Sequence, residues 1–84
     1  MIKIDWSENA ESNLQFIFDR VKRKTCSDNL ARNVINDIYS VSVNIQFTEQ
    51  YQVDETLGEP YRRMIVRHFK IIYKPLDNIH IRIL

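Results

Sequence analysis

The chain has 84 residues, a length that accommodates one domain. Hydrophobic residues make up 44% and charged residues 27%, and one glycine and two prolines exclude collagen-like and low-complexity proteins. Apolar runs are short, which excludes a transmembrane helix, and the N-terminus lacks the apolar stretch of a signal peptide. A single cysteine, Cys26, cannot form an internal disulfide. We therefore expect one cytoplasmic domain over residues 1–84, with a reduced thiol and no membrane partner.

The net charge of +1 conceals an asymmetry along the chain. Residues 1–59 hold six lysines and arginines against ten acidic residues, whereas residues 60–84 hold six against one. Basic segments attract phosphates and acidic protein segments. Residues 60–84 are therefore the first region to consider for a binding surface.

The N-terminal segment predicts a strand followed by a helix. Ile2, Ile4 and Trp6 alternate with polar residues, which is typical of a short strand with one apolar face. Ser7 is a suitable N-cap for a helix that extends to about Lys24. The apolar stripe of this helix consists of Ala10, Leu14, Ile17, Phe18 and Val21.

A second amphipathic stripe predicts a second helix. Ser27 is its cap candidate, and apolar residues recur at helical spacing from Leu30 to Ile45. Residues 38–43 also alternate as in a strand, but the continuous stripe favours a helix. The connection of about three residues predicts an antiparallel helical hairpin.

The remaining segments indicate strands. Residues 50–53 are a short strand candidate, and residues 54–60, which contain the single glycine, form a loop. Strands are expected over 61–67 and 69–74, with residues 75–78 forming a turn in which Pro75 ends the pairing. Residues 79–84 alternate again, and the chain stops inside this pattern, as a strand paired in the sheet or a shortened chain would.

This order of elements predicts an α+β domain, β-α-α-β-β-β. We expect the helical hairpin to pack on one face of a small antiparallel sheet. The other face is then open, and we expect it to carry the arginines and lysines between residues 62 and 74. That open cationic face is the candidate functional surface.

Two motifs in this order resemble the RelE/ParE toxin superfamily. In the first helix a polar cap is followed by an alanine and then by aliphatic residues at helical spacing: Ser7, Ala10, Leu14 and Ile17. In the strands a basic pair, Arg62 and Arg63, precedes the aromatic–basic–aliphatic–aliphatic–tyrosine segment 69–73. The resemblance extends over essentially the whole chain.

The resemblance implies the toxin of a type II toxin–antitoxin system, or plasmid stabilization protein, that a cognate antitoxin neutralises. ParE-like members inhibit DNA gyrase without a known bond cleavage, and RelE-like members are ribosome-dependent mRNA endoribonucleases. The long helical hairpin favours the ParE-like branch. In the family, further basic and tyrosine positions lie beyond the position of Leu84. A C-terminally truncated, inactive remnant that binds antitoxin is therefore a third alternative.

Five cations form the candidate contact surface for an antitoxin or target. In a RelE-like protein Lys70 would stand in the place of an arginine and Arg62 near the strand lysines, so these two are the catalytic candidates. The alternative is a solvated sheet face whose charges oppose edge pairing. The five residues are Arg62, Arg63, Arg67, Lys70 and Lys74.

The histidines and aromatic residues carry weaker signals. Neither His68 nor His80 has a second ligand at metal-binding spacing, so we expect no metal and no small-molecule cofactor. The aromatic strand residues could stack on bases, but burial of Phe69 and Tyr73 in the core is the favoured interpretation.

Overall fold

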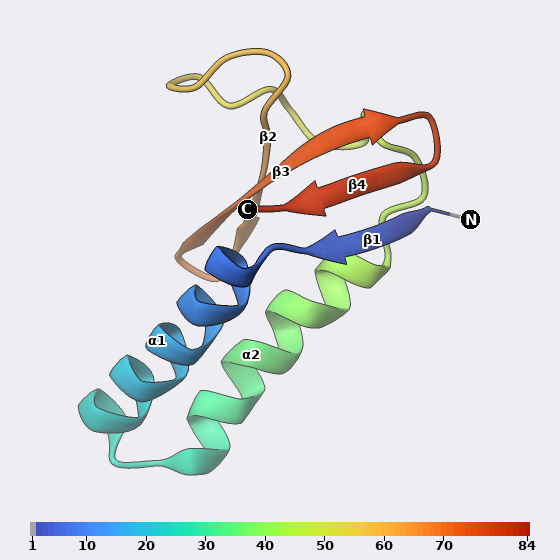
Figure 1. Cartoon of the computed structure of the whole chain (residues 1–84). Coiled ribbons are helices and arrows are strands. Elements are labelled where there is room, and N and C mark those ends of the chain that lie inside the picture. Colours follow the sequence, from blue (N-terminus) through green and yellow to red (C-terminus); the bar gives the residue numbers. More distant parts are fainter. Residues whose placement is uncertain (1) are drawn as a thin grey trace.

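The computed structural model describes residues 2–84, which form two helices and one four-stranded sheet (Figure 1). The α+β order predicted from the sequence, with a helical hairpin between the first strand and three later strands, is confirmed. The elements in chain order are β1 (Lys3–Trp6), α1 (Glu8–Thr25), α2 (Asp28–Val43), β2 (Arg62–Val66), β3 (Phe69–Asp77) and β4 (His80–Ile83).

The sheet is mixed, in the order β1-β4-β3-β2. Strands β2, β3 and β4 are antiparallel, as expected, but β1 runs parallel to β4, with Ile4 opposite Ile81. A parallel pair needs a long connection between its strands. The helices and the other two strands together supply that connection, so the first strand can complete the sheet beside the last.

Side-chain caps determine where the two helices begin and meet. The Ser7 hydroxyl accepts the Ala10 N–H at 3.0 Å, and the Ser27 hydroxyl likewise accepts the Leu30 N–H at 3.2 Å. Between the helices Cys26 adopts a left-handed conformation, φ 55°, and ends α1. A helix end and a helix start on consecutive residues produce the short connection that the sequence predicted.

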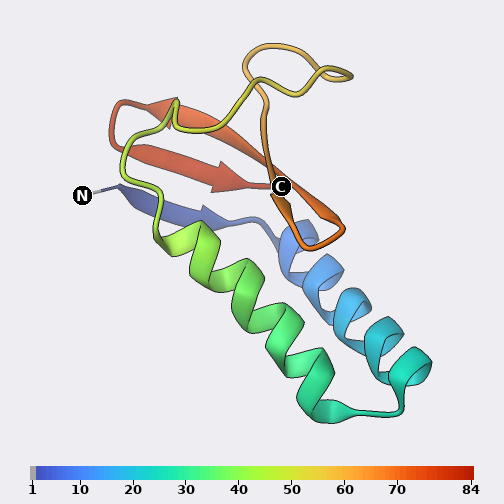
Figure 2. The ribbon, with the colours of Figure 1, turned by 180° about the vertical axis from the view of Figure 1, so that it is seen from behind.

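The helix α2 contributes more to the core than α1. Its buried residues, Ala31, Val34, Ile38 and Ser42, recur every three or four positions, so residues 38–43 continue the helix. In α1 only Ala10 is fully buried. The far end of the hairpin projects away from the sheet in both views (Figures 1 and 2). No helix within residues 2–84 has the length and apolarity needed to cross a membrane.

The core lies between the helical hairpin and one face of the sheet. Tyr73 on β3 is 0% exposed, and its hydroxyl donates to the Thr48 carbonyl at 2.8 Å. The same oxygen accepts the Tyr51 N–H at 3.4 Å, so β3 holds the segment that follows α2. The strand residues of the core are Met64, Val66, Ile71, Tyr73, Ile81 and Ile83.

The structure differs from the sequence prediction around residues 50–53 and 75–78. Residues 50–53 form a single bridge, Val53 to Arg62, and no strand. β3 continues through Pro75 to Asp77, and the turn follows at residues 78–79. β2 begins opposite Tyr73, so the missing N–H of Pro75 removes no hydrogen bond between these two strands.

Candidate functional site

The pairing register assigns each strand residue to one side of the sheet, because directly opposed residues share a side. Met64 and Ile71 pair and are buried in the core. The next pair, Ile65 and Lys70, therefore lies on the opposite, open side. Lys74 is paired with Arg82 on this open side. We call the open-side cations Arg63, Lys70, Lys74 and Arg82 the cationic face.

Carboxylates of this chain already pair with three of these four cations. Two belong to the residues that follow the Val53 bridge: Asp54 contacts Lys70, and Glu55 Oε2 lies 3.0 Å from Arg63 Nη2. The third pair joins β4 to β1, with Arg82 Nε 3.0 Å from an oxygen of Asp5. Lys74 has no ion pair within residues 2–84, so the cationic face keeps one unbalanced positive charge.

Asp54 is the most constrained of these carboxylates, with an exposed fraction of 1%. One oxygen contacts the ammonium of Lys70, and the other accepts the N–H groups of Thr56 at 3.1 Å and Leu57 at 2.8 Å. The hydrogen bond from Lys70 lowers the pKa of Asp54, the backbone N–H groups add to this, and burial opposes it. Asp54 is therefore ionised at neutral pH.

The structure brings together only three of the five cations that the sequence placed on one face. Arg63, Lys70 and Lys74 share the open side. Arg62 faces the opposite side, where its guanidinium donates to the Tyr51 carbonyl at 2.7 Å. The two catalytic candidates, Lys70 and Arg62, are thus separated by the sheet.

Arg67 lies away from the cationic face for a conformational reason. It occupies the turn between β2 and β3 with φ 57°, so the strand alternation no longer applies to it. Its Nε lies 2.8 Å from an oxygen of Asp37 on α2. Arg67 therefore joins the sheet to the helical hairpin.

Two residues of the site were not among the sequence candidates. Arg82 alternates with the isoleucines of β4, so the sequence alone could have predicted that it lies on the open side of the sheet. Asp54 carried no comparable signal, because it lies in a loop whose path over the sheet depends on tertiary contacts. Its partner Lys70 lies 16 positions further along the chain.

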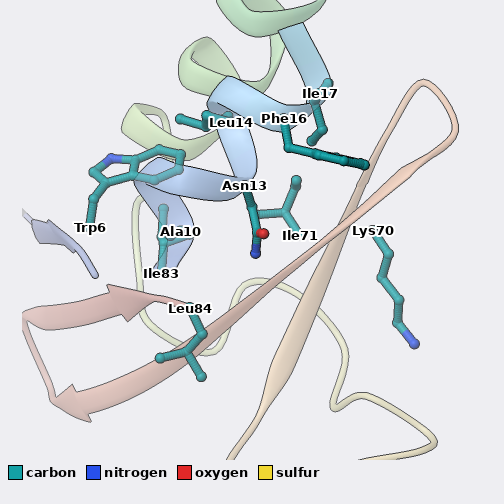
Figure 3. Close-up of a pocket in the computed structure, with 10 residues that line it drawn as sticks. All are labelled: Trp6, Ala10, Asn13, Leu14, Phe16, Ile17, Lys70, Ile71, Ile83 and Leu84. Carbon is teal, nitrogen blue, oxygen red and sulfur yellow. The ribbon is translucent and has the colours of Figure 1, made fainter. Parts of the chain in front are cut away.

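An apolar pocket of about 200 Å³ adjoins the cationic face (Figure 3). It lies between α1 and the ends of β3 and β4, and Phe16 on its α1 side is 60% exposed. Lys70 also lines the pocket, and its ammonium points away from the helix (Figure 3). Its main apolar lining residues are Trp6, Leu14, Phe16, Ile17, Ile71 and Ile83.

The other chemically distinctive side chains do not gather at this site. Cys26 is exposed in the helix connection, His68 lies in the turn after β2, and His80 lies on β4. Within residues 2–84 no three histidine, cysteine or acidic side chains are arranged to hold a metal ion.

The arrangement offers apolar area next to charge, a combination that suits recognition of a peptide segment. Lys70 contributes to both parts, through its side-chain stem in the pocket and its ammonium on the cationic face. No protein-family model, curated protein or solved structure matches the chain.

Proposed function

We propose that the chain is a RelE/ParE-like toxin of a type II toxin–antitoxin system that acts by binding in the cytoplasm. A cognate antitoxin would neutralise it by covering the apolar pocket and the cationic face. The observation that carries this proposal is the meeting of the two surfaces at Lys70. The helical hairpin packed on a sheet, which the resemblance implies, supports it further.

The chemistry of the surface defines the antitoxin segment that would fit. A pocket of about 200 Å³ accepts one or two apolar side chains, and the cationic face, which meets the pocket at Lys70, attracts carboxylates. Disordered segments of mixed acidic and apolar composition bind in this way and fold as they bind. The exposed ring of Phe16 would be covered in such a complex, which gives the interface an aromatic anchor.

A non-enzymatic, ParE-like action on DNA gyrase is favoured over mRNA cleavage. A ribonuclease needs its acid, base and cations gathered around one phosphate. Lys70 and Arg62 lie on opposite sides of the sheet, and each is engaged, Lys70 with Asp54 and Arg62 with a backbone carbonyl. This separation supports binding as the mode of action.

Controlled expression in a bacterial host tests the proposal. The chain is induced alone and together with the product of the small gene beside its own, and growth and co-purification are measured. We expect growth arrest from the chain alone and relief by the neighbouring product. If the chain captures the neighbouring product but does not slow growth when expressed alone, it is the inactive remnant instead.

A matched pair of variants locates the antitoxin contact. Phe16→Glu places a charge at the pocket and should weaken capture roughly tenfold or more, as expected when an aromatic anchor is lost. Phe47→Glu is the control, since Phe47 is 56% exposed and lies outside this pocket. Equal capture of both variants would reject the pocket as the contact surface.

Two assays with the purified chain then distinguish DNA gyrase from mRNA as the target. Inhibition of gyrase supercoiling supports the ParE-like action. Codon-linked mRNA cleavage in a translation extract would instead support the RelE-like endoribonuclease.

A further inference from the structure

The loop over residues 54–60 is acidic and contacts the cationic face. It contains Asp54, Glu55 and Glu59 and no lysine or arginine. It projects beyond the start of β2 in both views (Figures 1 and 2). Its first two residues form the ion pairs with Lys70 and Arg63 described above.

Two ion pairs attach the loop to the cationic face, and at its base the Asp54 N–H donates to the Tyr61 carbonyl at 2.8 Å. Its backbone hydrogen bonds close the loop on itself: the Gly58 N–H donates to the Asp54 carbonyl at 2.8 Å, and the Tyr61 N–H donates to Gly58 at 2.9 Å. Leu57 is exposed and adds no apolar anchor. Ion pairs at a protein surface are individually weak and exchangeable. A competing carboxylate can therefore replace Glu55, whose side chain is 67% exposed, without disturbing the core. Asp54 is 1% exposed and also accepts two backbone N–H groups, so it leaves Lys70 only when the loop opens.

The cationic face attracts further negative charge even with the loop in place. Lys74 lies directly opposite Arg82, and like charges in that position repel each other. An Asp5 carboxylate oxygen lies 3.0 Å from Arg82 Nε and neutralises only this residue. Lys74 has no ion pair in the described chain. An acidic segment that reaches Lys74 relieves this repulsion, which the loop does not do.

We propose that Asp54 and Glu55 occupy, in the free protein, the site that carboxylates of an acidic partner segment occupy in the complex. The partner binds by exchange with the loop, pairing with Lys70 and Arg63 and adding Lys74. This inference rests on the proposed function, because it describes how the acidic antitoxin segment is received. The exchange itself can be measured whether or not the chain is toxic.

The loop itself indicates that the ligand is a peptide. Two consecutive residues of a polypeptide, Asp54 and Glu55, place their carboxylates on two cations of neighbouring strands. A partner chain with consecutive acidic residues reproduces this spacing with the same chemical group. The exchange thus makes the affinity for such a segment depend on the strength of the loop's own ion pairs.

The test uses the whole chain and a fluorescein-labelled decaglutamate peptide as the probe, followed by fluorescence anisotropy. Glu55→Gln removes the ion pair of Arg63 and leaves its bond to Gln52 Oε1 at 3.1 Å. We expect this variant to bind the probe about two- to fivefold more tightly, as for the release of one surface ion pair. Glu59→Gln is the matched control, because it changes the net charge equally while Glu59 has no ion pair in the described chain. We expect its affinity to equal that of the unmodified chain.

A second readout follows the loop directly by NMR. The amide signals of Thr56 and Leu57 report the bonds to Asp54, and Asp54→Ala supplies their positions in an open loop. With saturating decaglutamate we expect both signals to move towards those open positions. The exchange is overturned if the probe does not bind, or if the two amide signals stay in place at saturation. It is also overturned if Glu55→Gln and Glu59→Gln increase the affinity for the probe equally. Tighter binding of a decathymidylate that shifts the same signals would overturn the assignment to a peptide.

Discussion

The phenol of Tyr73 should determine whether the segment after α2 stays attached to the sheet. Its ring is completely buried, and its hydroxyl donates to the Thr48 carbonyl at 2.8 Å. Burial raises the pKa of Tyr73 above its ordinary value, so the hydroxyl remains protonated and able to donate at physiological pH. Tyr73→Phe removes this hydroxyl while keeping the aromatic ring in the core.

The expected loss of stability follows from the partners that the hydroxyl leaves behind. Thr48 is itself buried, so its carbonyl would lose a partner where water has little access, which costs about 1–3 kcal/mol. The Tyr51 N–H is bonded at 3.4 Å, near the limit of a hydrogen bond, and adds little. We expect a loss of about 2 kcal/mol in the free energy of unfolding, or a Tm lower by roughly 8–16 °C for a domain of this size.

Thermal and urea unfolding followed by circular dichroism measure this change. Tyr39→Phe is the control, because Tyr39 is 54% exposed and its hydroxyl has no hydrogen bond within residues 2–84. The control should stay within about 0.5 kcal/mol of the unmodified protein. If the two variants have equal stabilities, the buried hydrogen bond of Tyr73 does not hold this segment.

Two further predictions concern the loop and the helix connection. The pKa of Asp54 lies below the ordinary 3.8, so Asp54 should pair with Lys70 at neutral pH. The stabilising contact should be lost only as the pH falls through the lowered pKa. A carboxyl ¹³C titration measures this, and a midpoint at or above 3.8 would contradict the prediction. Cys26→Gly should stabilise the fold by about 0.5–1 kcal/mol in urea unfolding, because glycine adopts the left-handed φ of 55° without strain. Cys26→Ala should show no such gain, and an equal gain would indicate that the thiol, and not the backbone, is responsible.

The fold was predictable where periodicity and caps act locally. The buried positions of α2 repeat at helical spacing, and Ser7 and Ser27 cap the helices as their sequence contexts predicted. The parallel placement of β1 beside β4 was not predictable in this way. It depends on where the helical hairpin returns the chain, and no local pattern encodes that.

The cationic face was predictable only in part, because residue type alone does not give direction. Arg62 and Arg63 are neighbours on a strand and must point to opposite sides of the sheet. Arg67 continues an alternating pattern in the sequence, but a left-handed backbone at this position starts the turn and removes it from the face. Turns with positive φ favour glycine, so an arginine there gives no warning of the reversal.

The pairing of β1 with β4 sets an order on folding during synthesis. Of the four strands, β1 leaves the ribosome first, and its neighbour β4 follows only after the other elements: Asp5 contacts Arg82, 77 positions later. The helical hairpin can assemble from local contacts while translation continues, whereas β1 must wait, unpaired, until β4 has been made. The nascent chain therefore carries an uncovered apolar strand, which includes Ile4 and Trp6, until β4 has been synthesised, and during this time the strand is open to chaperones and to premature association.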